Sequence, residues 1–135
     1  MNPILMLGAV LGLLAVGGGA LAEHLLLPGL DELGIRRIDV ALQYHHFGAL
    51  GVTAVGLALL AVQAARTRRH LAWAGGLLAV GTMLFSFTIY LGAGSGVGVP
   101  GWLTPLGGLM QMGGWIMLVW AGWRARPVKV ANEVA

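Results

Sequence analysis

Side chains that could do chemistry are few in this chain, and they lie beside or within long apolar runs. A neutral imidazole binds metals or carries protons, and a neighbouring carboxylate can orient its ring. His24 directly follows Glu23, and His45 directly follows Tyr44. The candidate site residues are Glu23, His24, Tyr44, His45, Ser86, Tyr90 and Thr104. Because the chain has no cysteine, disulfides, thiolate metal sites and cysteine nucleophiles are excluded.

The composition shows what kind of structure must hold these side chains. Of the 135 residues, 58% are hydrophobic and only 10% are charged, against about 25% charged in soluble domains. Residues 1–22, 40–65 and 70–123 contain no Asp, Glu, Lys or Arg. About 20 apolar residues cross the hydrocarbon of a bilayer, so the first two runs hold one span each and the third holds two. These proportions exclude a water-soluble globule.

The sequence therefore predicts an all-α membrane protein, a bundle of four transmembrane helices with both termini cytoplasmic. A single domain, residues 1–127, precedes a short tail, residues 128–135. The predicted spans cover residues 4–27, 40–64, 71–91 and 103–123. Four spans place both ends of the chain on one side, which then holds six of the eight Lys and Arg residues and is cytoplasmic by the positive-inside rule. Basic clusters at span ends serve orientation, so no nucleic-acid binding is expected.

Glycines that recur on one helix face predict how the spans pack. In lipid no hydrophobic effect drives helices together, so association depends on close backbone approach at small residues. The glycines at such spacings are Gly8, Gly12, Gly48, Gly51, Gly107 and Gly114. They predict a packed bundle and indicate no chemistry.

Helical phase predicts which candidate side chains point inward. At about 100° per residue, Tyr44 shares a face with Gly48 and Gly51, and His45 lies one step from that face. His45 is therefore expected to point inward. Ser86 and Tyr90, four residues apart, share one face of the third span and can both turn inward. In the predicted topology all the candidate side chains lie in the outer half of the bundle, whereas the inner half is nearly all Ala, Gly, Leu, Val and Met.

Three interpretations of these polar side chains stay open. In the first they hydrogen-bond to one another and fix helix register. In the second His24 and His45 bind a divalent metal or supply both axial ligands of a haem, with Glu23 orienting a ring nitrogen. In the third a Glu–His pair handles protons or a small solute. The absence of polar groups from the inner half disfavours a continuous transport path.

Several segments resemble a family of small bacterial inner-membrane proteins, the YgdD-like proteins, a domain of unknown function. Gly19–His24 is similar to the family's "GAFGAH", and Gln43–Leu50 to its "QYxxxHAL". Gly81–Ser86 followed by Tyr90 resembles "GxxLFSGSLY", and Thr104–Gly108 followed by Gly114-Trp115 resembles "TPxGG…GW". The resemblance covers nearly the whole chain, and implies four spans in the bacterial inner membrane with no established activity.

The resemblance also implies which residues matter, and it contains departures. The implied residues are His24, Tyr44, Ser86, Tyr90, Thr104, Pro105 and Trp115. Gly48 stands where the family has the histidine of "HAL", and His45, one helical turn earlier, is expected to fill similar space. Glu23 replaces a small residue of the family pattern, which would place a charge beside His24.

Taken together, the sequence predicts a membrane component without catalytic activity. The small size, glycine-rich faces and one-sided polar groups favour an accessory or structural subunit packed against a larger complex in the bacterial inner membrane. Its expected partners are the lipid bilayer, bound lipid and other integral membrane subunits, with no cofactor. A histidine-ligated metal or haem site on the periplasmic side is the first alternative, and small-solute or proton transport is the second.

Overall fold

The computed structural model describes residues 1–94 and 97–125, and within them the chain forms four long helices and no strand. α1 spans Pro3–Leu21 and continues through the π-helical turn η1, Ala22–Leu26, and the 3-10 turn η2, Leu27–Gly29. α2 spans Glu32–Ala61. α3 spans Ala65–Thr82 and continues through the π-helical turns η3, Met83–Phe87, and η4, Tyr90–Gly94. α4 spans Leu103–Arg124. The all-α prediction is confirmed, whereas the predicted tail lies outside the described residues.

Two helices begin well before the predicted spans. α2 begins at Glu32 rather than at residue 40, because the side chain of Asp31 caps it and accepts a hydrogen bond from the Gly34 amide at 2.8 Å. α3 begins at Ala65 rather than at residue 71. In both cases the charged stretch expected to be a loop is helical. A helix can continue past the hydrocarbon into water, so charge marks the end of a span and not the end of its helix.

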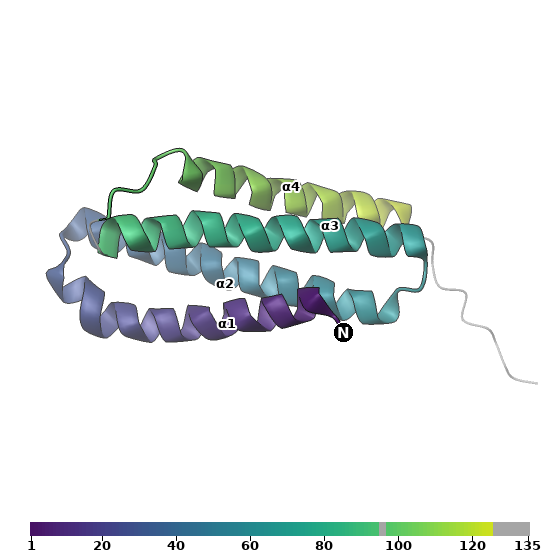
Figure 1. The fold of residues 1–135 in the computed structure, drawn as a ribbon, viewed down its shortest axis with the longest axis horizontal. Coiled ribbons are helices and arrows are strands. Elements are labelled where there is room, and N and C mark those ends of the chain that lie inside the picture. Colours follow the sequence, from purple (N-terminus) through teal and green to yellow (C-terminus); the bar gives the residue numbers. More distant parts are fainter. Residues whose placement is uncertain (95–96, 126–135) are drawn as a thin grey trace, which may run out of the picture.

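The helices lie lengthwise beside one another and alternate in direction (Figure 1). α1 packs on α2, α2 on α3, and α3 on α4. α1 and α4 lie on opposite sides of the pair α2 and α3, with both the start of α1 and the end of α4 at the same end of the molecule (Figure 1). α2 and α3 are therefore the central helices.

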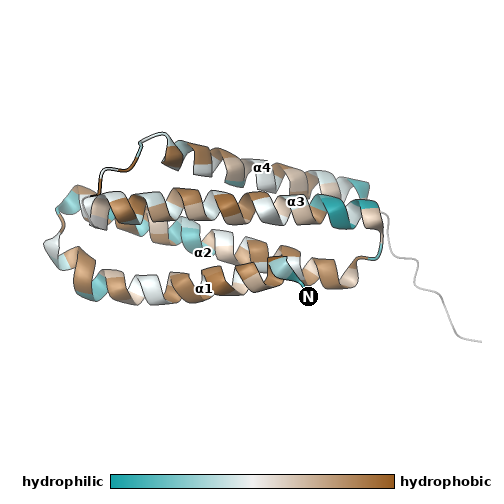
Figure 2. Cartoon of the chain, in the orientation of Figure 1, coloured by the Kyte–Doolittle hydropathy of each residue, from teal (hydrophilic) through white to brown (hydrophobic). Residues whose placement is uncertain are grey.

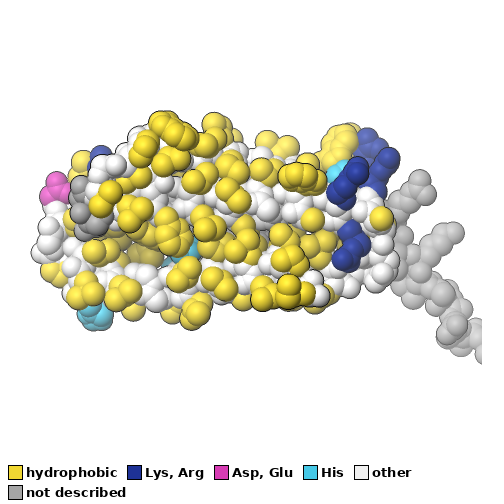
Figure 3. Space-filling view, viewed as in Figure 1, with side chains coloured by type: hydrophobic (Ala, Val, Ile, Leu, Met, Phe, Trp, Pro, Cys, Tyr) yellow, Lys and Arg dark blue, Asp and Glu magenta, His cyan; other side chains and the backbone are white. Residues whose placement is uncertain are grey.

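The outer surface is apolar along most of its length, as Figure 2 shows for the ribbon and Figure 3 for the side chains. Leu13 on α1 and Val119 on α4 are both 74% exposed. Residues 3–29, 32–61 and 65–93 are long and apolar enough to cross a membrane. α4 is not among these candidates. It has no charged residue before Arg124, but its glycines and Gln111 lower its hydropathy.

Glycines set the closest helix contacts. A Cβ on Gly8 would lie 2.6 Å from the Thr53 amide nitrogen, and one on Gly114 would lie 2.7 Å from Leu78 Cγ. Gly51 contacts the Trp115 ring, whereas a Cβ on Gly107 would overlap the backbone of Phe85.

Gly12 does not take part in this packing: a Cβ there would meet nothing within 4 Å. The buried face of α1 runs through Gly8, Leu11 and Ala15. Gly12 lies one residue away from that face, so its predicted packing role is wrong.

Candidate functional site

Three of the candidate side chains meet between α2 and α3, and we call His45, Ser86 and Tyr90 the α2–α3 polar cluster. His45 is 1% exposed, and its Nδ1 lies 3.2 Å from the Tyr90 hydroxyl oxygen. The imidazole also packs against Phe87, with ring centroids 5.5 Å apart. The Ser86 hydroxyl donates to the Ala41 carbonyl oxygen at 3.0 Å. The cluster therefore ties the end of α3 to α2 by two hydrogen bonds, one at Ser86 and one at Tyr90.

The local backbone explains why both α3 side chains reach α2. Ser86 lies in the π-helical turn η3, and Tyr90 begins the π-helical turn η4. A π-helical turn changes the direction in which the following side chains point, and such turns often occur at functional sites. The hydroxyls of Ser86 and Tyr90 consequently reach different partners on α2, the Ala41 carbonyl and the His45 ring.

The second ring nitrogen of His45 takes no part in the hydrogen bond to Tyr90. Nε2 is buried and has no hydrogen-bond partner among the described residues. The backbone of Leu11 on α1 interacts with the ring. An imidazole held through Nδ1 with a free Nε2 can bind one further group, but no group of three or more His, Cys, Asp or Glu side chains in the described part of the chain could hold a metal ion.

Glu23 and His24 do not join this cluster. Both lie exposed in η1, and neither side chain makes a hydrogen bond or ion pair within the described residues. The buried face of α1 continues to Ala22, so the next two residues project away from α2. The predicted pairing of His24 with the buried His45 is therefore not present.

The remaining candidates lie at the edges of the bundle. Tyr44 is 46% exposed and packs against Phe85 of η3, with ring centroids 4.9 Å apart. Thr104, in the first turn of α4, is partly buried and lines a surface hollow with Arg37. Within the described residues, no hydrogen bond or ring contact joins either side chain to the α2–α3 polar cluster.

Gly48 stands in a position that no side chain could fill. A Cβ there would overlap the side chain of Thr82, which is fully buried and donates to the Leu78 carbonyl oxygen at 2.7 Å. The space expected for the family's histidine is thus taken by Thr82. His45 does not replace it, since its ring turns toward Phe87 and Tyr90 instead.

A second polar feature, a groove beside Gln111, was not predicted from the sequence. A groove of about 330 Å³ lies between α2 and α4, and we call it the α2–α4 groove. Its lining residues are Gln43, Tyr44, Phe47, Gly108, Gln111, Met112 and Trp115. Gln111 is 6% exposed, and its Nε2 is buried without a hydrogen-bond partner among the described residues. The sequence feature that could have indicated this groove is Gln111, a single amide in the charge-free run of residues 103–123.

Comparison with known proteins places the chain in a family. The model of a family described as "Protein of unknown function (DUF423)" matches residues 18–108. The chain belongs to the DUF423 family. The match includes the whole α2–α3 polar cluster of this DUF423 protein and ends in α4, before Gln111.

Full-length relatives agree with that assignment. This DUF423 chain is 35% identical over 119 residues to the UPF0382 membrane protein YwdK of Bacillus subtilis, covering 88% of this chain and 94% of the relative. It is 27% identical over 130 residues to the UPF0382 inner membrane protein YgdD of Escherichia coli, covering 96% of both chains. No solved structure shows significant similarity. The predicted membership of a YgdD-like family is confirmed, and with it the membrane nature of the protein.

Proposed function

We propose that this membrane protein is an accessory subunit without catalytic activity, which packs against a larger membrane complex through the α2–α4 groove. The observation that carries the proposal is the Gln111 amide, buried at the groove with no partner in the described chain. Gln111 lies near the middle of α4, far from the charged residues at both ends of the helices. Its amide is therefore at membrane depth, where water is scarce.

The chemistry of the groove favours a transmembrane helix as the occupant. An amide without a hydrogen bond costs roughly 2–7 kcal/mol in an apolar environment. Transmembrane helices associate through small residues and through side-chain hydrogen bonds between them. The groove offers Gly108 as the small residue, and the buried Gln111 amide would donate once its side chain turns into the groove. A backbone carbonyl or polar side chain on a partner helix would satisfy the amide.

The walls of the groove fit the same occupant. Tyr44, Phe47 and Trp115 are 46%, 58% and 48% exposed. Aromatic side chains of this kind are enriched where protein surfaces bind one another. The groove is too small for a whole helix, so the partner helix would lie across it and insert side chains. The exposed outer faces of α1 and α4 would then remain in contact with lipid.

Orientation and location belong to the same proposal. With α4 as a fourth span, both termini are cytoplasmic in a bacterial inner membrane, because Arg66, Arg68, Arg69 and Arg124 lie at the end of the bundle where α1 begins. The chain has no cysteine, so single-cysteine variants can be labelled from outside intact cells. A cysteine at Gly29 should be labelled by an impermeant maleimide and one at Gln63 should not; the reverse pattern would contradict the orientation.

No observation favours a metal or haem site, or transport of a solute or protons, over an accessory role. The metal or haem alternative depended on His24 and His45 together, and only His45 is buried. The transport alternative depended on a Glu–His pair close to the outer surface, and Glu23 and His24 are both exposed there, without a hydrogen bond or ion pair to the described residues.

The experiment places a photoreactive amino acid at Met112 in the groove, or at Val119 outside it, in the native membrane. Both positions are well exposed, at 60% and 74%. The expected result is a crosslink from Met112, and not from Val119, to the transmembrane segment of another protein. Gln111→Leu should remove that crosslink, whereas Gln63→Leu, the same change in the loop between α2 and α3, should leave it.

Three outcomes would contradict the proposal. The first is a crosslink of equal strength from both positions, which indicates unspecific contact. The second is a crosslink that survives Gln111→Leu, since the amide would then have no role in docking. The third is a crosslink only to another copy of this chain, which indicates a homodimer rather than a subunit of a larger complex.

A further inference from the structure

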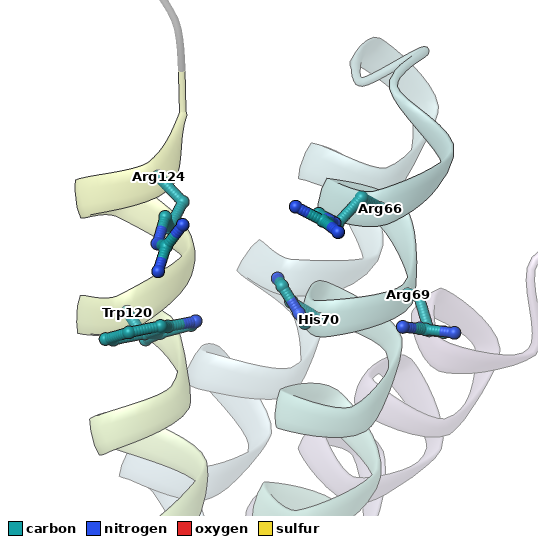
Figure 4. A pocket seen from close by; sticks show the side chains of 5 residues that line it. All are labelled: Arg66, Arg69, His70, Trp120 and Arg124. Atoms are coloured by element: carbon teal, nitrogen blue, oxygen red, sulfur yellow. The ribbon is translucent and has the colours of Figure 1, made fainter.

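We infer that the basic end of the bundle holds a binding site for the phosphate group of an anionic phospholipid, between α3 and α4. An open cavity of about 280 Å³ lies there, lined by Arg66, Arg69, His70, Trp120 and Arg124. In Figure 4 Arg66 and His70 point from α3 toward Trp120 and Arg124 on α4. This site is independent of the α2–α4 groove and of the docking role assigned to it.

The cavity is lined by positive charge, and no acidic side chain among the described residues neutralises it. No Asp or Glu occurs in the sequence from Val40 to Ala125. Figure 3 shows dark blue side chains gathered at this end of the molecule and magenta ones at the other. Arg66 and Arg69 make no hydrogen bond or ion pair within the described residues. Their guanidinium groups are therefore available to a ligand.

The position of these arginines on α3 is unfavourable without an anion. The N-terminus of a helix carries partial positive charge, and basic side chains in the first turn repel it. The first turn of α3 has no acidic residue, and Ala64 at its N-cap offers no side-chain hydrogen bond. Free amide groups, a positive dipole end and arginines together favour a negatively charged oxygen ligand.

Arg68 shows how the same conflict is resolved inside the protein. Its guanidinium donates to the carbonyl oxygens of Leu59 and Val62, at the negatively polarised C-terminal end of α2. Arg66 and Arg69 have no such carbonyl partners in the described chain. Arg68 thus has a structural role, and the other two arginines are left for an external anion.

The tryptophan places the anion at the membrane surface. Arg124 stacks on the Trp120 ring, with its guanidinium carbon 4.6 Å from the ring centroid, an arrangement that holds the guanidinium in place. Trp120 contacts Trp123 in turn, at 5.7 Å between ring centroids. Tryptophan prefers the headgroup region of a bilayer. The cavity therefore opens at headgroup level, where lipid phosphates are concentrated and free phosphate is not.

The test measures lipid binding to the full chain by native mass spectrometry in detergent, with phosphatidylglycerol and phosphatidylcholine compared. Wild type should retain phosphatidylglycerol preferentially. Arg66→Gln with Arg124→Gln should weaken that binding by about 30-fold, since each basic residue at a membrane surface contributes about fivefold. Arg36→Gln with Arg37→Gln, the same charge change at the other end, should leave it unchanged.

A variant that keeps all charges separates a built site from general attraction. Trp120→Ala should weaken phosphatidylglycerol binding about threefold to fivefold by freeing Arg124, while Trp73→Ala, on an exposed face of α3, should not. Circular dichroism confirms that each variant is folded. Equal loss in both arginine pairs, no effect of Trp120→Ala, or no preference over phosphatidylcholine would overturn the inference. Competition by millimolar inorganic phosphate would overturn the lipid as the ligand.

Discussion

α2 meets polar groups on two sides, and the two contacts differ. Toward α3 it forms a closed interface in which Thr82 and Ser86 are fully buried and hydrogen-bonded to backbone carbonyls. Toward α4 it borders the open α2–α4 groove, where the Gln111 amide nitrogen is buried with no hydrogen-bond partner in residues 1–94 and 97–125. Most polar groups at the first contact are satisfied inside the chain, and the key group at the second is not.

The difference separates polar groups that hold the protein together from one that has no hydrogen-bond partner in the described chain. Hydrogen bonds within the α2–α3 interface should contribute to stability of the isolated protein. A buried amide without an acceptor lowers that stability, and an acceptor on another molecule would remove the cost. Stability measurements on the purified chain can therefore test the distinction at single residues.

The largest expected effect is at Gly48. Gly48→Ala places a methyl group on the Thr82 side chain, which is β-branched, fully buried and unable to turn away. Overpacking of this kind should lower the free energy of unfolding by about 3 kcal/mol. Unfolding by SDS titration would measure it.

Gly12→Ala is the matched control, since a methyl group there meets nothing within 4 Å. It should change stability by less than about 0.5 kcal/mol. Adding Thr82→Gly should recover part of the loss caused by Gly48→Ala. Equal stability of the Gly48 and Gly12 variants would show that α2 and α3 do not meet as described.

The next effect is at Tyr90. Tyr90→Phe removes the hydroxyl beside His45 Nδ1, so neither ring nitrogen then has a hydrogen-bond partner among the described side chains. A buried polar group left in that state costs about 1–3 kcal/mol. Tyr44→Phe, which alters an exposed tyrosine with no hydrogen bond to the described residues, is the control for the same chemical change. If the Tyr90 variant were as stable as the Tyr44 variant, the hydrogen bond between Tyr90 and His45 would not stabilise the protein.

A smaller loss is expected at Ser86. Ser86→Ala deletes the hydrogen bond to Ala41, but the Ala41 carbonyl keeps its place in the α2 helix. Side-chain hydrogen bonds between membrane helices average about 0.6 kcal/mol, and the loss should be close to that value. Thr88→Val, which removes a hydroxyl without a described hydrogen bond, should have no measurable effect. A loss at Ser86 as large as that at Tyr90 would contradict the different roles given to the two hydroxyls.

A structural feature can be predicted from this sequence when it depends on one segment of the chain alone. The four helices follow from charge-free runs, because hydropathy is a property of each segment alone. The inward position of His45 follows from its phase relative to Gly48. The start of α2 was missed because the capping side chain of Asp31 extends the helix beyond its apolar part.

The site was only partly predictable, because its members depend on which helix faces meet. Glu23 and His24 lie close to His45 in a topology diagram, yet they follow the buried Ala22 of η1 and are exposed. Gln111 carries no motif, and its importance appears only when α2 and α4 form a groove beside it. Gly12 lies four residues after the packing glycine Gly8, but no other helix in the described part of the chain comes within 4 Å of the position that its Cβ would take.

No loss of stability at all is expected at Gln111, and this result distinguishes the two contacts most directly. Gln111→Leu replaces an unpaired amide by an apolar side chain, so the purified chain should lose no stability and should gain up to about 1 kcal/mol. The same substitution should abolish the crosslink from Met112 in the native membrane. A stability loss as large as that of Tyr90→Phe would mean that the amide already has a partner inside the protein. The groove would then be an internal contact like the α2–α3 interface, and Gln111 would give no reason to expect a second helix there.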